Sequence, residues 1–301
     1  MLSLARKGSR SLEQTLIWRS RNKRYACLTH DIDLASGAGL EFGPGNNPVE
    51  LPTGLGITYI DYDLKANADL SNRVPIDYAW SGSGSLRNVL GRSEYDFAIA
   101  AQVAQYVPNV LGWFRGIHTV LRPGGVLNLS LPDRRLMFDA GRNESTIAEM
   151  VEADVHEYDR PSVRQIFAHT YETLAVEPAQ VWAGKSPLEA SRYCGEAALA
   201  LAYKQSVEDH ATGYYRNCHC WVFTPTSFLD VFEAATRLGL FKFVLNQLTM
   251  PDVGGCEFYI SLRRDVEEEP QSLLNLQLAA IHYLREDLSR VSREAQVLYG
   301  A

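Results

Sequence analysis

The chain has 301 residues, of which 46% are hydrophobic and 22% charged; these ordinary globular proportions exclude a wholly disordered or collagen-like chain. No stretch approaches the roughly 18 consecutive apolar residues of a membrane-spanning helix, so we expect no integral membrane segment. The net charge of −7 argues against nucleic acid as a partner of the chain as a whole.

The first 35 residues are expected to form a basic helical leader. Seven of the first 25 residues are Lys or Arg, and Glu13 is the only acid among them. Two interpretations stay open: a solvated, weakly amphipathic helix, or a docking site for an acidic surface or anionic lipid. The leader lacks a secretory signal pattern and the chain's five cysteines are unevenly spaced, so we expect a protein of the reducing cytoplasm.

Residues 36–265 are expected to form one domain, beginning with alternating strand and helix patterns. Residues 110–121 have apolar groups at helical spacing and end at Arg122-Pro123-Gly124-Gly125, a helix-stopping turn. This alternation predicts an α/β fold with a largely parallel sheet. The apolar strand patterns around this helix lie in residues 39–48 (a strand running into a glycine-rich turn), 56–63, 74–80, 95–101 and 126–131.

The second half of this domain begins with an insertion, residues 141–221, which is mainly helical in pattern. A clear helix follows, which Thr224 can cap and Gly239 can end. Two closely spaced strands, 241–248 and 257–262, should then pair antiparallel.

Residues 266–301 are expected to be a linker and a C-terminal helix. Apolar residues recur there every three or four positions, with polar Gln277 as the exception. The pattern fits a short coiled coil, through which a homo-oligomer could form, or a terminal helix packed on its own domain.

The glycine-rich turn after the first strand is the first candidate binding feature. Gly43 and Gly45 let the backbone turn sharply and approach a ligand closely. Asp61 ends the second strand, where a carboxylate can accept both hydroxyl hydrogens of a ribose, and Asp77 could accept from an adenine amine at the end of the third. Pro48 occupies the third glycine position of a dinucleotide fingerprint, which disfavours an NAD-linked oxidoreductase, and no phosphate-binding P-loop is present.

The order of these motifs resembles the class I S-adenosylmethionine-dependent methyltransferases. The runs E-F-G-P-G, Y-I-D, Y-D-F-A-I-A-A-Q-V and V-L-R-P-G-G-V-L carry the resemblance, together with the closing helix and hairpin. A narrower similarity, in residues 131–139 and 218–225, is to bacterial methyltransferases associated with surface-glycan and secondary-metabolite biosynthesis. The family implies a Rossmann-like, seven-stranded, mostly parallel sheet with one antiparallel strand.

The resemblance also implies a cofactor, S-adenosylmethionine, and its contacts. It implies Asp61 on the ribose, Asp77 near the adenine, Gln102 beside the sulfonium, and the turn around the methionine part, formed by Glu41, Phe42, Gly43, Pro44 and Gly45. Many relatives carry a His and a Glu-His pair after the fourth strand. Here Gln102 stands there, and an amide cannot act as a base.

We therefore expect methyl transfer to a small polar acceptor, an oxygen of a sugar or secondary metabolite, under a lid formed by residues 141–221. The altered run from Gln102 to Tyr106 motivates an alternative, a non-catalytic subunit that assembles through its C-terminal helix. A hydroxyl acceptor needs a base, and the candidates are Asp133, His169 and His219.

Each candidate base has a structural reading beside the catalytic one. His219 could simply pack the insertion to the core, His169 could be solvated on a helix, and Asp133 could form an ion pair with an arginine. Otherwise Arg134 or Arg135 could hold an acidic acceptor. Cys218 and Cys220 flank His219, but adjacent residues of a strand point to opposite faces, so we expect no metal site. Three aromatic residues could wall a ring-shaped acceptor or pack in the core: Tyr214, Tyr215 and Trp221.

Overall fold

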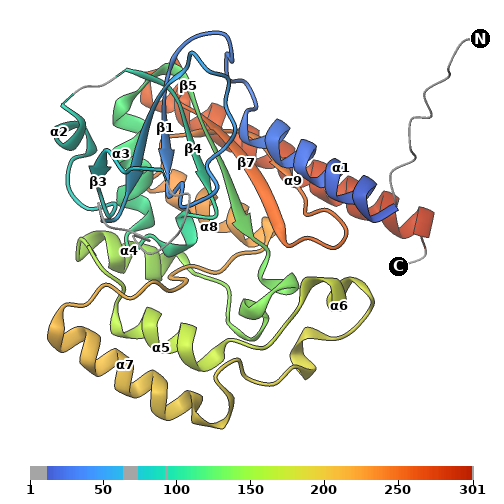
Figure 1. Cartoon of the computed structure of the whole chain (residues 1–301). Helices are drawn as coiled ribbons and strands as arrows, with labels where there is room; N and C mark the ends of the chain where they lie inside the picture. Colours follow the sequence, from blue (N-terminus) through green and yellow to red (C-terminus); the bar gives the residue numbers. More distant parts are fainter. Residues whose placement is uncertain (1–11, 64–73, 92–93, 300–301) are drawn as a thin grey trace, which may run out of the picture.

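The computed structural model describes residues 12–63, 74–91 and 94–299 (Figure 1). These form a seven-stranded sheet in the order β3-β2-β1-β4-β5-β7-β6. Strand β7 runs antiparallel to both of its neighbours and the other strands are parallel, so the expected fold is confirmed. The strands are β1 (Ala38–Phe42), β2 (Gly56–Asp61), β3 (Tyr78–Ala79), β4 (Tyr95–Ala101), β5 (Leu121–Pro132), β6 (Val244–Thr249) and β7 (Glu257–Arg263).

Helices cover the two faces of the sheet unequally. On one face α3 (Val110–Val120), α8 (Pro225–Arg237) and α9 (Pro270–Tyr299) pack over the large apolar core, beside the short α2 (Leu86–Leu90). The other face carries a smaller core under the end of α1 (Leu12–Leu28). The middle strands are buried on both sides, which is why they read as continuous apolar runs.

The end of the leader, residues 23–30, packs on this domain. Cys27 and Leu28 of α1 are buried against the sheet, and buried Asn128 of β5 donates through Nδ2 to the carbonyl oxygens of Leu28 and His30. Two of the leader's cations are also paired, Lys23 with Asp252 and Arg24 with Glu257. Arg6, Lys7 and Arg10 lie outside the described residues, as does the side chain of Arg19.

Two strand boundaries differ from the sequence expectation. Strand β3 spans only Tyr78–Ala79, so Asp77 precedes it instead of ending it. Helix α3 ends at Val120 as expected, but β5 begins at once with Leu121, and the Pro-Gly-Gly turn forms an irregularity inside the strand. Gly124 there has a left-handed φ of 84° and donates its N–H to the carbonyl of Arg264. The turn therefore lies within β5, hydrogen-bonded to the residue that follows β7, and does not separate the helix from the strand.

Helix α9 packs on its own domain. Ile281 and Leu284 of the apolar seam are buried against α8 and β6. The polar exception, Gln277, is also buried, and its Nε2 donates to the carbonyl oxygens of Phe241 and Phe243. The side chains of Ala295 and Leu298 lie outside the described residues.

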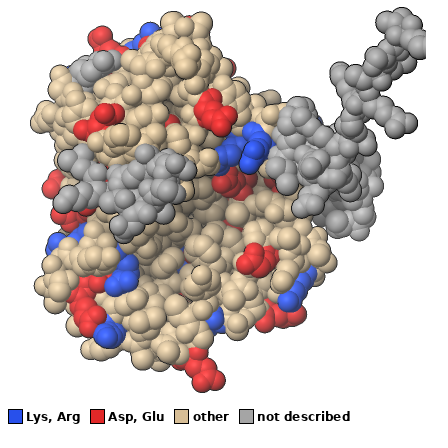
Figure 2. Space-filling model, viewed as in Figure 1, with Lys and Arg blue, Asp and Glu red and all other residues tan. Residues whose placement is uncertain are grey.

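The insertion lies across the carboxyl ends of the parallel strands (Figure 1). The chain leaves β5 and returns beside it, since Asp133 and Phe223 form a parallel bridge. In Figure 2 the surface is hollowed between the sheet and the insertion. The insertion is mainly helical, as expected, and contains α4 (Ile147–Val155), α5 (Val163–Glu172), α6 (Pro178–Trp182) and α7 (Ala198–Thr212).

Candidate functional site

A pocket of about 190 Å³ opens at the carboxyl ends of β1, β2 and β4. Four of the predicted cofactor residues line it: Phe42, Gly43, Asp61 and Gln102. In an open α/β sheet this edge is where ligands bind. The remaining lining residues are Ile60, Tyr62, Trp80, Ser81, Val103, Tyr106, Val107, Trp113, Tyr215 and Asn217.

The turn after β1 needs glycine at Gly43. Its φ is 57°, its N–H donates to the carbonyl of Ile60 at 2.8 Å, and an added Cβ would lie 2.7 Å from a methyl group of Val103. Gly45 has a similar φ of 54° but nothing within 4 Å of such a Cβ. Pro44 and Gly45 are not among the lining residues. Of the two glycines of the turn, only Gly43 therefore lines the pocket.

Glu41 lies behind this turn and is buried. One carboxylate oxygen accepts the N–H of Val49 at 2.9 Å, and the other has no hydrogen-bond partner within the described residues. Burial raises the pKa of Glu41 to about 7, although the Val49 N–H acts in the opposite direction. Glu41 does not line the pocket, so its position is suited to supporting the turn through the hydrogen bond to Val49.

The two aspartates expected at nucleoside contacts are placed differently. Asp61 lines the pocket at the end of β2, with Oδ1 accepting the N–H of Tyr62. Asp77 is exposed and outside the pocket lining, and its carboxylate accepts the N–H of Tyr59 at 2.8 Å. Because β3 begins one residue after Asp77, the residues that follow the strand, Trp80 and Ser81, line the pocket instead.

Gln102 stands at the end of β4 in a strained conformation. Its φ of 61° is in the left-handed region, and its N–H donates to the carbonyl and the hydroxyl of Ser130. Its side-chain oxygen accepts from Nε2 of buried Gln105 at 2.8 Å. Gln102 Nε2 and Gln105 Oε1 are buried without a partner within the described residues. Unpaired amide atoms beside a pocket are suited to a polar ligand.

His219 belongs to a buried polar cluster beside this pocket. Its Nδ1 lies 2.5 Å from Oδ2 of Asp139, and its ring contacts Tyr106, a pocket residue, edge-on at 4.6 Å. Arg142 donates through one nitrogen to Oδ1 of Asp139 and to the backbone carbonyl of His219. Burial acts to raise the pKa of Asp139, but the hydrogen bond and charge of His219, with Arg142, hold it below its usual range.

This arrangement fixes the tautomer of His219. The ionised Asp139 only accepts, so Nδ1 of His219 carries a proton and, in the neutral ring, Nε2 carries the lone pair. His169 is the opposite case: its Nδ1 accepts the backbone N–H of His219 at 3.3 Å, which leaves the proton on Nε2. Burial, followed by the charge of Arg142, lowers the pKa of His169 to about 4. His219 is thus suited to accept a proton, and His169 to donate a hydrogen bond.

Asp133 is engaged in structure. Its wholly buried carboxylate forms a two-pronged ion pair with Arg135, through Nε at 2.9 Å and Nη2 at 2.5 Å, and accepts the Arg135 N–H. The ion pair expected as one alternative is therefore present. Arg134 donates to the carbonyl of Ala140. With its oxygens occupied, Asp133 is a poor candidate for the base.

Sequence reasoning missed Asp139 and Arg142, which support His219. They precede it in the chain by 80 and 77 positions, respectively. It also did not select Tyr62, Trp80, Ser81 or Asn217. Of the three aromatic residues named for the acceptor wall, Tyr215 lines the pocket, Tyr214 is exposed, and Trp221 is buried in the core.

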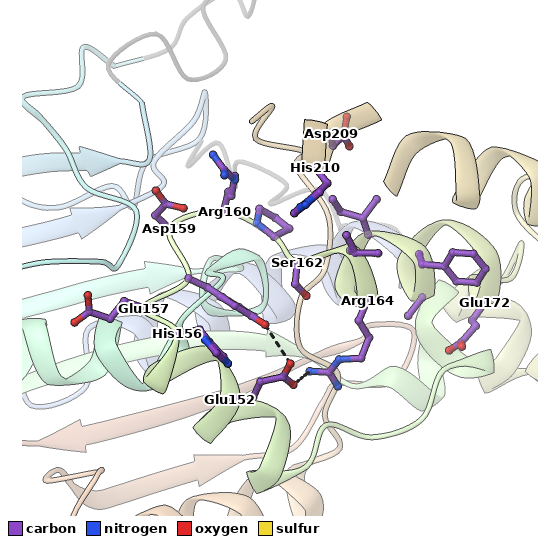
Figure 3. Close-up of a pocket in the computed structure, with 16 residues that line it drawn as sticks. Glu152, His156, Glu157, Asp159, Arg160, Ser162, Arg164, Glu172, Asp209 and His210 are labelled. Carbon is purple, nitrogen blue, oxygen red and sulfur yellow. Dashed lines mark hydrogen bonds and ion pairs between the residues drawn. The ribbon is translucent and has the colours of Figure 1, made fainter. Parts of the chain in front are cut away.

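A larger cavity, about 720 Å³, lies elsewhere in the insertion (Figure 3). It is formed by α4, α5, the loop between them and the end of α7. None of its described lining residues belongs to a strand, and its Arg164 is already paired with Glu149 and Glu152. It is therefore a surface groove separate from the sheet edge.

Within the described residues, no group of three or more His, Cys, Asp or Glu side chains could hold a metal ion. None of the described helices is long and apolar enough to cross a membrane. All five cysteines are free.

The comparisons with known proteins concern the fold and the family. One similar solved structure is an S-adenosylmethionine-dependent methyltransferase from Thermotoga maritima (12% identity, 83% of this chain and 90% of that one covered, TM-score 0.40). A second is an S-adenosylmethionine-dependent methyltransferase from Mesorhizobium loti (14% identity, 82% of this chain and 97% of that one covered, TM-score 0.39). Another is the 1,6-didemethyltoxoflavin N1-methyltransferase of Burkholderia thailandensis (11% identity, 84% of this chain and 83% of that one covered, TM-score 0.41). A search of curated proteins finds no match. A family model described as a methyltransferase domain matches residues 17–235, and the chain therefore belongs to this family, as an enzyme that uses S-adenosylmethionine.

Proposed function

We propose that this methyltransferase acts on an oxygen of a small polar acceptor, a hydroxyl of a sugar or secondary metabolite, with His219 as the base. The observation that carries the proposal is the buried pair of Asp139 and His219 next to the pocket. A carboxylate or an unprotonated amine needs no base for methyl transfer, whereas a hydroxyl is a weak nucleophile until its proton is removed.

The residues of the pocket fit S-adenosylmethionine. Asp61 can accept the two ribose hydroxyls, the turn at Gly43 allows close approach, and the unpaired Nε2 of Gln102 can donate to the ligand. Glu41, Phe42, Pro44 and Gly45 are proposed to shape the methionine end of the site. Asp77 lies outside the pocket lining and holds the N–H of Tyr59 instead of the adenine. When bound, the cofactor supplies a methyl group activated by a positively charged sulfur.

The protein's own part is proton removal and the exclusion of water. Nε2 of His219 takes the hydroxyl proton, and the carboxylate of Asp139 stabilises the resulting imidazolium and keeps the ring oriented. Residues 141–221 act as the lid over the acceptor, since their last segment already contributes Tyr215 and Asn217 to the pocket. The five free cysteines support the cytoplasm as the compartment.

Two measurements test this function. Calorimetric titration with S-adenosylhomocysteine should show at least about 10-fold weaker binding by Asp61→Ala, because a charged hydrogen-bonding partner is lost. Asp77→Ala, the matched control, should bind within about 3-fold of wild type.

The second measurement follows S-adenosylhomocysteine formation with a panel of hydroxyl, carboxylate and amine acceptors. Turnover should require a hydroxyl, and His219→Gln should lower kcat by about 10²–10⁴-fold. Turnover of carboxylates or amines alone, unaffected by His219→Gln, contradicts the proposal.

A further inference from the structure

The last segment of the insertion, residues 213–221, crosses from the helices of the insertion to the loop after β4. It begins at Gly213, which ends α7 with a left-handed φ of 73°. Its far end is fixed: the Cys220 N–H donates to the Gln105 carbonyl at 2.7 Å, and Trp221 Nε1 donates to the Val107 carbonyl at 2.6 Å. The segment therefore has a turn at one end and a firm attachment at the other.

Between these ends, Tyr215 closes over the pocket. Its ring stacks on Tyr62, with centroids 4.4 Å apart and planes within 9° of parallel. Its hydroxyl donates to the Tyr106 carbonyl at 3.3 Å. Burial raises the pKa of both phenols, and both rings are half-buried. Because Tyr62 follows Asp61 directly, the stack ties the insertion to the end of β2 that faces the proposed ribose position.

The size of the pocket shows what this contact does. Its volume is about 190 Å³, whereas pockets that hold small-molecule ligands usually measure about 300–1,000 Å³. Tyr215 and Asn217 form the part of the wall that comes from the insertion. The pocket therefore has to enlarge to admit a nucleoside. Within the described residues, one stack and one hydrogen bond hold Tyr215 to the sheet side, so this side chain is the part of the wall suited to move.

We propose that the Tyr62–Tyr215 stack is a latch on the cofactor pocket, which separates to admit and release the cofactor and re-forms over it. This rests on the cofactor site of the proposed function. The same segment carries His219 four residues after Tyr215, where Asp139 and Arg142 hold the base independently of the latch. The insertion then serves both substrates, instead of covering the acceptor alone.

The test is stopped-flow measurement of S-adenosylhomocysteine association and release by the full chain. Trp80 and Trp113 line the pocket and provide the fluorescence signal. Loss of an aromatic stack should raise the release rate of Tyr215→Ala and of Tyr62→Ala by about 3- to 10-fold. A latch also hinders entry, so association should speed up in both variants. Tyr215→Phe keeps the stack and should release at close to the wild-type rate.

Two controls sharpen this result. Tyr214→Ala removes an exposed neighbouring ring and should leave both rates unchanged. The double variant Tyr62→Ala/Tyr215→Ala should release no faster than either single variant, because the two rings act through one contact.

Each failure has a separate meaning. Release rates equal to wild type in both single variants, or additive effects in the double variant, overturn the latch while leaving the cofactor site intact. A wild-type protein that does not bind S-adenosylhomocysteine, or an Asp61→Ala variant that binds equally well, overturns the cofactor site of the proposed function.

Discussion

Nδ1 of His219 and Oδ2 of Asp139 lie 2.5 Å apart in a cluster that excludes solvent. Asp139 also faces Arg142, whose side chain is only 5% exposed. The carboxylate therefore compensates the positive charge of Arg142 and orients the ring of His219. Removing it leaves a buried cation without its partner.

Asp139→Asn should lower the free energy of unfolding by about 3–5 kcal/mol, measured by urea denaturation at neutral pH. Asp230→Asn is the control: it breaks the ion pair of an exposed aspartate with Arg285 and should cost under about 1 kcal/mol. Because the pKa of Asp139 is lowered in the folded state, its contribution is lost as the pH falls through that value. Wild type should therefore lose more stability than Asp139→Asn below about pH 4; equal losses contradict this role.

His169 predicts a second pH effect, in a higher range. Its folded pKa is about 4, because burial and then Arg142 disfavour the charged ring, whereas an unfolded histidine titrates near about 6.5. Between these values the unfolded chain binds more protons, so the free energy of unfolding falls as pH decreases. The decrease from His169 is at most about 1.4 kcal/mol per pH unit.

The measurement is urea denaturation of wild type and His169→Gln at several pH values from about 7 to 4. The slope should be smaller in the variant. His282→Gln changes a side chain that is 59% exposed and should retain the wild-type slope. An unchanged slope in His169→Gln means that His169 is not held neutral in the folded protein.

Gly43 and Gly45 form a natural pair for testing the turn. Both have a left-handed φ, so Ala at either position strains the backbone by about 1–2 kcal/mol. Only at Gly43 would the new Cβ press on Val103, a pocket residue, at 2.7 Å. Calorimetry should therefore show a larger loss of S-adenosylhomocysteine affinity in Gly43→Ala than in Gly45→Ala. Equal losses indicate that strain alone, and not close approach, explains the glycine at position 43.

Gln277 is expected to matter for stability and not for the cofactor. Gln277→Leu leaves the carbonyls of Phe241 and Phe243 without this donor inside the core, which should cost about 1–3 kcal/mol in urea denaturation. Gln271→Leu, at an exposed position of the same helix, should cost under about 0.5 kcal/mol. S-adenosylhomocysteine affinity should be unchanged in both variants, and a loss of affinity in Gln277→Leu contradicts this division.

The half of the site that sequence predicts best is built from local pattern. The turn at Gly43 directly follows β1, Asp61 is the last residue of β2, and parallel strands bring their carboxyl ends to one edge. Asp77 shows the limit of this reasoning. A two-residue edge strand has no periodicity from which its end could be predicted. The strand begins after Asp77 instead of ending at it, so Trp80 and Ser81 line the pocket in place of Asp77.

The other half depends on contacts between distant segments. His219 could be selected as a candidate base, but its partner Asp139 lies 80 residues away, and only the return of the insertion brings them together. Helix α9 shows the same limit. An apolar seam is equally suited to packing on a second copy or on its own domain. The structure shows packing on its own domain, where the side chain of Gln277 donates to two backbone carbonyls of the same chain.

The bridge between Asp133 and Phe223 brings the start and the end of the insertion to the same point beside β5. The chain therefore leaves the sheet and returns to it at one place, which a connecting segment of another length could also join. Exchange of this segment is a route by which acceptor preference could diverge during evolution while the framework is inherited unchanged. One constraint accompanies such an exchange. A replacement segment has to supply its own counterparts of Tyr215 and Asn217, because these two residues form part of the wall of the pocket at the carboxyl ends of β1, β2 and β4.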